Sequence, residues 1–258
     1  TFSVIVPCLM AIFLNNLNLW EHLDIIIGFC LYAITGNTLN DMIDAKNPEE
    51  KETIERIKGF HWKEIATISI ISFVFGTMLF VRTIRTHPIN LLILIMIIGM
   101  VVFYCIKKDL PIINQILLGV SHVFLPYLII KIDSSIEPLL TPGEWFLMFC
   151  FFSFTFTGQI VHEIIDGDSI TRFSLRVQQL TVLISSIITI TMGIAILFII
   201  EFEKSIYFLP FCLIPIGSIY TFRKPTSSTK GVKDVGIILG NIILVYFLVL
   251  ILMFINLS

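Results

Sequence analysis

The sequence predicts an all-α, polytopic membrane protein with nine transmembrane helices in a single bundle. Three observations support this fold class: 56% of the 258 residues are hydrophobic, only 14% are charged, and the mean hydropathy is +0.94. Soluble domains carry about 25% charged residues, and a water-exposed surface has to be covered by polar groups that this chain does not have. Lipid is therefore the solvent that suits this composition.

Nine apolar stretches are long enough, or nearly so, to cross a bilayer as a helix, which takes about 20 residues at ~1.5 Å rise each. They are residues 2–19, 24–40, 63–81, 89–106, 110–131, 144–165, 177–200, 205–222 and 235–257. The loop 41–62 is the longest of the polar breaks between them. Trp20, Trp62 and Trp145 fall at predicted span ends, where aromatic side chains collect at membrane–water interfaces.

No composition shift or low-complexity tract divides the chain, so we expect one domain over residues 1–258. It begins inside an apolar run without Met, and we expect its amino end to be trimmed. The five cysteines are scattered and form no CxxC pair, which favours apolar packing over a disulfide or zinc role. No basic tail or acidic run is present, so nucleic acid is excluded as a partner.

The distribution of basic residues predicts the orientation of the chain. Of the 17 Lys and Arg residues, all but four lie in the connections after the second, fourth, sixth and eighth predicted helices. The four on the other side are Arg82, Arg85, Lys131 and Lys204. Cytoplasmic loops are enriched in Lys and Arg, so the richer side is predicted to be cytoplasmic. In the cell membrane, the amino end then faces the cytoplasm and the carboxyl end faces outside.

Acidic residues are almost absent from the predicted spans but gather at two span ends on the cytoplasmic side. The first group, in the segment GNTLNDMID, comprises Asn37, Asn40, Asp41 and Asp44. If the second helix continues through this segment, these side chains recur on one face at three- and four-residue spacing. Asn40 and Asp44 are then one turn apart and can offer two oxygens to one ion.

The second group ends the sixth span in the segment QIVHEIIDGD and comprises His162, Glu163, Asp166 and Asp168. Glu163 and Asp166 are three residues apart, and His162 and Asp166 are four apart, so a helix again places them on one face. Both groups end even-numbered spans. They are therefore predicted to face the same side of the membrane.

Carboxylates at the rim of a bilayer are costly unless they bind a partner. Oxygen ligands suit Mg²⁺, which takes one or two carboxylates and fills its remaining positions with substrate phosphates. Two such groups facing each other would hold a diphosphate through Mg²⁺, while the apolar bundle holds a hydrophobic chain attached to it. Basic residues on the same side could neutralise the diphosphate: Lys51, Arg56, Lys58, Lys107, Lys108 and Arg172.

Each group also has a plainer interpretation as helix caps or solvated loop residues, because Asp and Asn are common at helix ends. The polar residues within spans are better explained by interhelical hydrogen bonds; they are Gln115, His122, Gln159 and Asn241. The Phe-rich run 149–156 is better explained by lipid or core packing than by a substrate wall.

At these motifs the sequence resembles the UbiA superfamily of intramembrane prenyltransferases, over essentially its whole length. That family has nine transmembrane helices, an NDxxDxxxD motif after helix 2 and a DxxxD motif after helix 6. Here residues 40–44, NDMID, match the first part of the first motif. Pro48 stands at the position where the family has the last Asp of that motif. In the second motif Asp166 is kept, but Ile170 stands at the position of the motif's second Asp. The next Asp in this chain, Asp168, comes two residues before that position.

The resemblance implies a Mg²⁺-dependent transferase that moves a prenyl group from a polyprenyl diphosphate to an aromatic or lipid acceptor through an allylic cation. Two Mg²⁺ ions are implied to bridge the diphosphate. Asn40 and Asp44 would bind one ion, and Asp166, with Asp168 or Glu163, the other.

The end of the fourth helix adds to the resemblance. Tyr104 and Lys108 match the family's Tyr-xxx-Lys, which implies that both contact the diphosphate. With Arg172 they are our catalytic candidates. The candidates for substrate binding are Asn37, Asp41, Lys51, Arg56 and Lys107.

Two alternatives stay open. A terpene cyclase of the same family would ionise the same diphosphate without a second substrate. A transporter or a lipid-binding protein without catalysis belongs to a different class, and a transporter predicts acids or broken helices near the bilayer midplane. The acids of this chain lie at the rim.

Overall fold

The structure is a computed structural model that describes residues 2–46, 48, 51–107, 110–166, 169–200, 204, 207–208 and 241–253. Over these residues it is helical and contains no strand, as predicted. Among them, six stretches are long and apolar enough to cross a membrane: Leu19–Asp44, Trp62–Leu79, Ile89–Ile106, Ile113–Asp133, Pro142–Val161 and Leu175–Ile199. The shorter apolar helices are Ser3–Leu14 and Asn241–Met253.

The second to seventh predicted spans each correspond to one of these six stretches. The first is shorter than predicted, because its helix ends at Leu14 and the chain turns through Asn16, which has a φ of 52°. Of the eighth predicted span, all but residues 207–208 lies outside the described residues. The ninth contains the short C-terminal helix Asn241–Met253.

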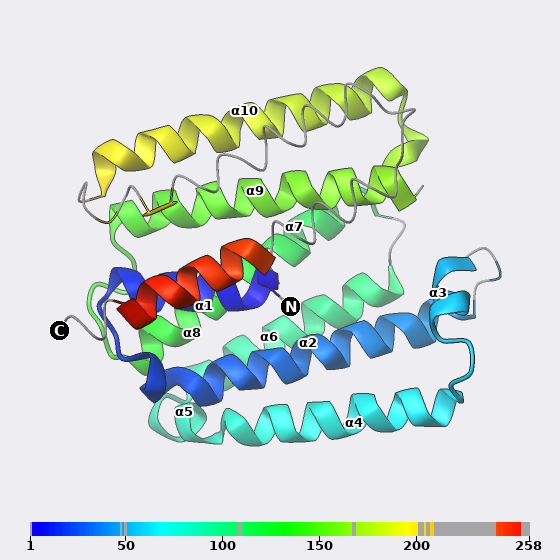
Figure 1. Ribbon diagram of the computed structural model, residues 1–258, viewed down its shortest axis with the longest axis horizontal. Coiled ribbons are helices and arrows are strands. Elements are labelled where there is room, and N and C mark those ends of the chain that lie inside the picture. The colour runs from blue at the N-terminus through cyan, green and yellow to red at the C-terminus, as the bar shows by residue number, and fades with distance from the viewer. Residues whose placement is uncertain are drawn as a thin grey trace.

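The long helices run side by side along the longest axis of the molecule (Figure 1). They are α2 (Leu23–Asp44), α4 (Trp62–Leu79), α6 (Ile89–Ile106), α9 (Pro142–Asp166) and α10 (Leu175–Ile199). The pairs α2–α4 and α9–α10 pack closely. Short helices connect them: η1 (Leu19–His22), α3 (Lys51–Arg56), α5 (Val81–Thr86) and η3 (Ser169–Arg172).

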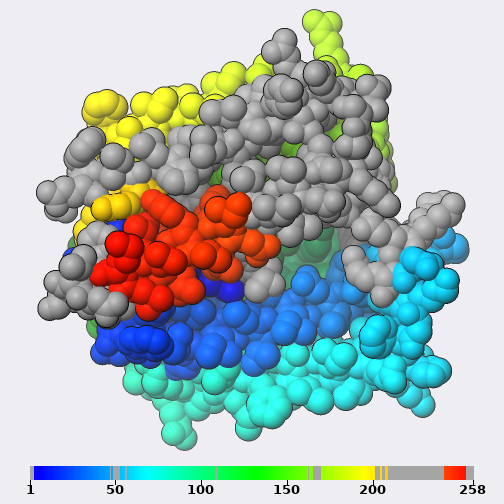
Figure 2. Space-filling view, viewed as in Figure 1, coloured from blue at the N-terminus to red at the C-terminus, as the bar shows by residue number. Residues whose placement is uncertain are grey.

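Helix α1 (Phe2–Leu14) forms the core of the bundle. Its side chains from Val4 to Phe13 are buried, and α2 and α8 pack against it. The C-terminal helix, red in Figure 2, adds Phe247, whose ring meets that of Phe13 edge-on at 6.5 Å. By contrast, α4 exposes most of its apolar side chains. A helix that is apolar all round and exposed on its outer face suits contact with lipid.

The α2–α4 interface is closed by small residues. A Cβ at Gly76 would lie 2.7 Å from Cδ1 of Tyr32, and one at Gly28 would lie 2.8 Å from Cε2 of Phe80. Both glycines therefore let an aromatic ring rest on the backbone of the neighbouring helix. Close approach at small residues is the usual way in which membrane helices associate.

The fifth spanning stretch is interrupted. It consists of α7 (Ile113–Gly119), a π-helical turn η2 (Val120–Phe124) and α8 (Leu125–Asp133). The N–H of Leu125 bonds the carbonyl of Val120, five residues back. Pro126 follows and has no N–H to donate to the carbonyl four residues before it, which gives a local reason for the widened turn.

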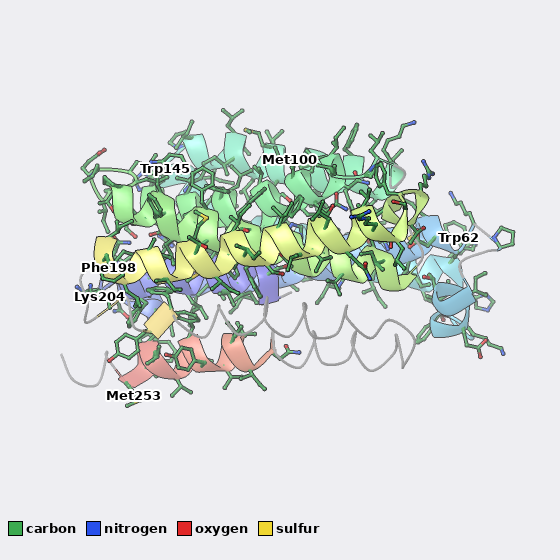
Figure 3. The ribbon with its side chains drawn as sticks, turned by 90° about the horizontal axis from the view of Figure 1, so that it is seen from above. Trp62, Met100, Trp145, Phe198, Lys204 and Met253 are labelled. Atoms are coloured by element: carbon green, nitrogen blue, oxygen red, sulfur yellow. The ribbon has the colours of Figure 1, made fainter. Side chains whose placement is uncertain are left out.

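The two ends of the bundle carry the features expected of membrane interfaces. All three tryptophans are exposed: Trp62 lies at one end, and Trp145 lies at the other together with Lys204 (Figure 3). Aromatic side chains at both ends fit an interfacial belt. Below, the end that holds Trp62, Asp44 and Asp166 is called the acid-bearing end.

Candidate functional site

Helix α2 continues through the first acidic group, as the predicted face requires. Asp44 is the last residue of the helix, and only 7% of its surface is exposed. The Asn40 side chain lies one turn back and donates from Nδ2 to Oδ2 of Asp44 over 2.7 Å. The other amide atom, Asn40 Oδ1, is buried and accepts no hydrogen bond. This pair thus presents a carboxylate and an unused amide oxygen together.

The remaining members of the first group are more accessible. Asn37 is exposed and Asp41 is half-buried. After Asp44 the helix stops: the Ala45 N–H bonds the Asp41 carbonyl, and Pro48 disfavours a helical conformation for the residue before it. The buried part of this group is therefore Asn40 with Asp44.

The second acidic group is linked to α7 through Gln115, for which the sequence predicts an interhelical hydrogen bond. Glu163 on α9 is 3% exposed, and Gln115 on α7 is 1% exposed. Nε2 of Gln115 donates to Oε1 of Glu163 over 2.5 Å, which confirms the interhelical bond. The amide oxygen of Gln115 is buried and without a hydrogen-bond partner.

Asn114, beside Gln115, was not singled out from the sequence. It is 0% exposed and donates from Nδ2 to the Lys107 carbonyl over 2.9 Å, so it joins the end of α6 to the start of α7. The turn between them places Ile112 at a φ of 70°. Oδ1 of Asn114 is again buried and unpaired. The signal in the sequence was two adjacent amides, NQ, within an apolar run.

These polar side chains belong to three helices, α2, α7 and α9, each of which has one terminus at the acid-bearing end (Figure 1). α2 packs on α6, α6 on α7, and α7 on α9. Tyr104 is half-buried near the end of α6, Lys107 is exposed at its cap, and Arg172 is exposed in η3. The structure therefore places both acidic groups at the same end, as predicted, with α6 and α7 between them.

Several predicted site residues lie wholly or partly outside the description. Lys108 and Asp168 are outside the described residues. Lys51, Arg56 and Asp166 are placed by their backbones in α3 and at the last position of α9, while their side chains are outside the description. Within the described residues, no group of three or more His, Cys, Asp or Glu side chains gathers around one point.

Oxygen atoms of the kind that hard divalent cations take are nevertheless present on the described residues of this end. Asp44 and Glu163 supply carboxylates, and Asn40, Asn114 and Gln115 supply buried amide oxygens that accept no hydrogen bond. A buried acceptor without a partner is costly, by about 1–3 kcal/mol, and such atoms call for an explanation. Cations with oxygen ligands, such as Mg²⁺, provide one.

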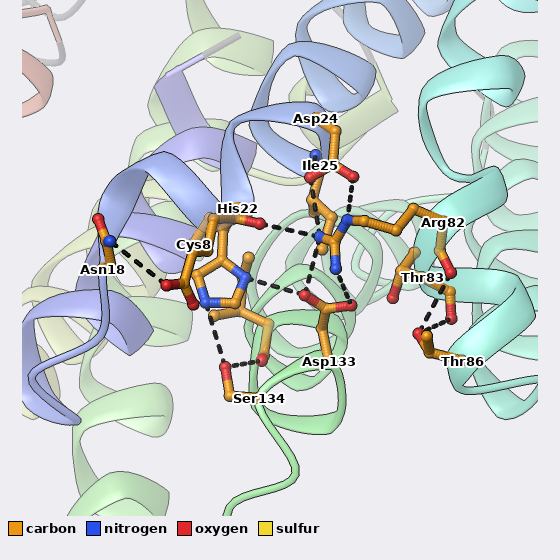
Figure 4. A network of polar contacts seen from close by, with 12 residues as sticks. Cys8, Asn18, His22, Asp24, Ile25, Arg82, Thr83, Thr86, Asp133 and Ser134 are labelled. Carbon is orange, nitrogen blue, oxygen red and sulfur yellow. Dashed lines mark hydrogen bonds and ion pairs between the residues drawn. The ribbon is translucent and has the colours of Figure 1, made fainter.

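The opposite end of the bundle is built from charges that pair with one another (Figure 4). Arg82 of α5 donates from Nε to Oδ2 of Asp24 over 2.6 Å and from one terminal nitrogen to Oδ2 of Asp133 over 3.0 Å. The same oxygen of Asp133 lies 2.9 Å from Nδ1 of His22. Hydrogen bonds to Asp24, opposed by burial and reinforced by Asp133, raise the pKa of the Arg82 guanidinium.

A second network at that end is more deeply buried. Lys131, 1% exposed, lies 2.8 Å from Oε1 of Glu144. The same oxygen accepts from the Tyr127 hydroxyl over 2.6 Å and from Nδ2 of Asn15 over 3.2 Å. Sequence reasoning missed both networks, although Lys131 at the end of one predicted span and Glu144 at the start of the next were visible as a possible pair.

His122 differs from its predicted role. Its Nδ1 lies 2.8 Å from the hydroxyl of Ser121, within its own helix, and not against another helix. Of the cysteines predicted to pack as apolar residues, Cys8, Cys105 and Cys150 are buried, and Cys30 is half-buried.

Comparison with protein-family models, with curated proteins and with solved structures finds no match to this chain.

Proposed function

We propose that this chain is an intramembrane prenyltransferase of the UbiA type. It would move a prenyl group from a polyprenyl diphosphate to an aromatic or lipid acceptor, with Mg²⁺ as cofactor. The acid-bearing end would face the cytoplasm and bind the diphosphate, and the apolar bundle would hold the prenyl chain.

The observation that carries the proposal is that α2 and α7, which both have a terminus at the acid-bearing end, hold buried oxygen acceptors without a partner. Five buried side-chain atoms lack a hydrogen-bond partner among the described residues, and three of them are the amide oxygens of Asn40, Asn114 and Gln115. The other two are Asn90 Oδ1, on a side chain that donates to Thr83 at the opposite end of the bundle, and Ser186 Oγ in α10. Unused acceptors next to Asp44 and Glu163 support an oxygen-binding cation as the missing partner.

Each described residue then has a chemical task. Asp44, oriented by Asn40, and Glu163, oriented by Gln115, would hold Mg²⁺. When bound, the ion would supply Lewis acidity toward the leaving diphosphate. Lys107 and Arg172 are exposed at the same end and would offset the remaining phosphate charge. The apolar interior behind them would exclude the water that competes for a reactive prenyl group.

The experiment uses the purified chain in lipid nanodiscs with geranylgeranyl diphosphate as the probe. Release of diphosphate should require Mg²⁺ and should stop on addition of EDTA. Glu55→Gln is a suitable control, because Glu55 is exposed in α3 and, among the described residues, pairs with Lys58 at 3.2 Å. Release that continues in metal-free buffer would contradict the proposal, and a cyclic hydrocarbon formed without an acceptor would favour the cyclase.

A further inference from the structure

The π-helical turn η2 lies at the centre of the bundle. The helices α1, α6 and α9 pack against it, in addition to α7 and α8 on either side of it in the chain. In Figure 1 this stretch passes behind α1. Widened turns of this kind inside α-helices are frequent at functional sites. An imidazole within a membrane span is likewise a candidate for function, and η2 contains His122.

We infer the tautomer of His122 from its contacts. When the hydroxyl of Ser121 donates its single proton to the Leu118 carbonyl, 3.3 Å away, its oxygen accepts from Nδ1–H of His122 over 2.8 Å. With the proton on Nδ1, Nε2 carries a lone pair. Among the described residues, no side chain donates a hydrogen bond to Nε2.

The position of His122 suits the second substrate. It follows Gln115 by seven residues, which places it about 10 Å further along the spanning stretch. Gln115 contacts Glu163 near the acid-bearing end. In a prenyl diphosphate the reacting carbon is bonded directly to the diphosphate, so an acceptor has to lie just inward of it. His122 is two helical turns inward.

We propose that Nε2 of His122 binds a hydroxyl group of the acceptor and removes its proton, an inference that rests on the proposed function. As the hydroxyl oxygen bonds to C1 of the prenyl group, the bond from C1 to the diphosphate oxygen breaks, and its electron pair leaves with the diphosphate. The hydroxyl proton moves to Nε2. Ser121 is a positioning residue that keeps Nδ1 protonated throughout, and the product is a prenyl ether.

Binding is tested without turnover by ¹⁵N NMR of histidine-labelled protein in nanodiscs. The probes are 4-propylphenol, which has a hydroxyl, and its methyl ether 4-propylanisole, which has none. We expect the phenol to shift the unprotonated Nε2 signal of His122 and the ether to leave it unchanged. The chain has five histidines, and His122→Gln identifies the signal by its loss. Ser121→Ala should spread the ring proton over both nitrogens.

Turnover separates this inference from the proposed function. With geranylgeranyl diphosphate and 4-propylphenol, we expect His122→Gln to slow ether formation about a hundredfold, within the range for a general base. Ser121→Ala should slow it about tenfold, and His87→Gln, at the opposite end, should stay within twofold. If the His122 variant is not monodisperse, Ser121→Ala and the phenol titration of the wild-type chain decide.

The two ideas fail in different ways. A wild-type chain that releases diphosphate with Mg²⁺, yet shows no phenol shift and forms ether equally well as His122→Gln, overturns the role of His122 alone. A phenol shift at Nε2 without any Mg²⁺-dependent release of diphosphate keeps the hydroxyl site and overturns the proposed function.

Discussion

The two ends of this bundle use polar residues in opposite ways. At one end Arg82, Asp133, Lys131 and Glu144 pair with one another, and every one of these charges has a partner in the protein. At the acid-bearing end the amides of Asn40, Asn114 and Gln115 donate hydrogen bonds to other groups of the protein. Their oxygens are buried and have no hydrogen-bond partner. Satisfied charges hold helices together, whereas a buried acceptor without a partner needs an explanation, and we propose a cation as the explanation at the acid-bearing end.

The largest expected effect is on stability at the paired end. Replacing Lys131 with Met leaves the Glu144 carboxylate buried and without its cation. Removing one partner of a buried pair costs about 3–5 kcal/mol, and we expect about 3 kcal/mol because Tyr127 and Asn15 still donate to Glu144. The check is reversible unfolding in mixed micelles. The double variant Lys131→Met/Glu144→Gln should recover part of the loss; no recovery would mean that the pair is not coupled.

At the acid-bearing end the main effect is expected on turnover. Asp44→Ala should lower the rate of diphosphate release about a hundredfold, equivalent to about 2.7 kcal/mol of activation free energy, and should leave the unfolding midpoint nearly unchanged. Initial rates with geranylgeranyl diphosphate, compared with those of Glu55→Gln, provide the measurement. A fully active Asp44→Ala protein would remove the first acidic group from the site.

A smaller loss of activity is expected from the second group. Glu163→Gln keeps a side chain of the same shape beside Gln115 but removes the negative charge, so we expect about a tenfold loss in rate. A higher Mg²⁺ concentration should restore part of it. Rates measured over a Mg²⁺ titration test this, and an identical Mg²⁺ dependence in both proteins would assign Glu163 a packing role.

The partly exposed network of Arg82 should matter least. Its side chain is 46% exposed, and ion pairs in contact with solvent contribute about 0–1 kcal/mol. Arg82→Ala should therefore destabilise the bundle by about 1 kcal/mol, which makes it a weaker link than Lys131. A loss larger than that of Lys131→Met in the same unfolding measurement would reverse the order proposed here for the paired end.

Much of the helical layout could be predicted because apolar runs end at residues that stop a helix. The span 89–106 coincides with α6, which begins after Pro88 and is capped at Lys107. The first predicted span was too long, because the apolar residues on either side mask the short polar turn after Leu14 when hydropathy is averaged over a whole span. The continuation of α2 to Asp44 was expected from the three- and four-residue spacing of its polar face.

Pairings between distant residues could not be predicted from spacing along one helix. The bond of Arg82 to Asp133 and that of Gln115 to Glu163 depend on which helices become neighbours. The π turn that contains Ser121 and His122 is likewise not indicated by a helical period of 3.6 residues. The acidic groups were visible in the sequence because carboxylates are rare in apolar spans, while Asn114 was hidden by its apolar neighbours.

The most direct test of the central claim is a titration of the nanodisc-embedded chain with Mn²⁺, followed by electron paramagnetic resonance of the free ion. If the unused oxygens beside Asp44 and Glu163 await a cation, the wild-type protein should bind Mn²⁺ in the presence of a non-hydrolysable geranylgeranyl diphosphate analogue. Asn40→Ala and Asp44→Ala should weaken that binding at least tenfold, whereas Glu55→Gln should not. Mn²⁺ binding that is absent, or equally strong in all four proteins, would contradict the account.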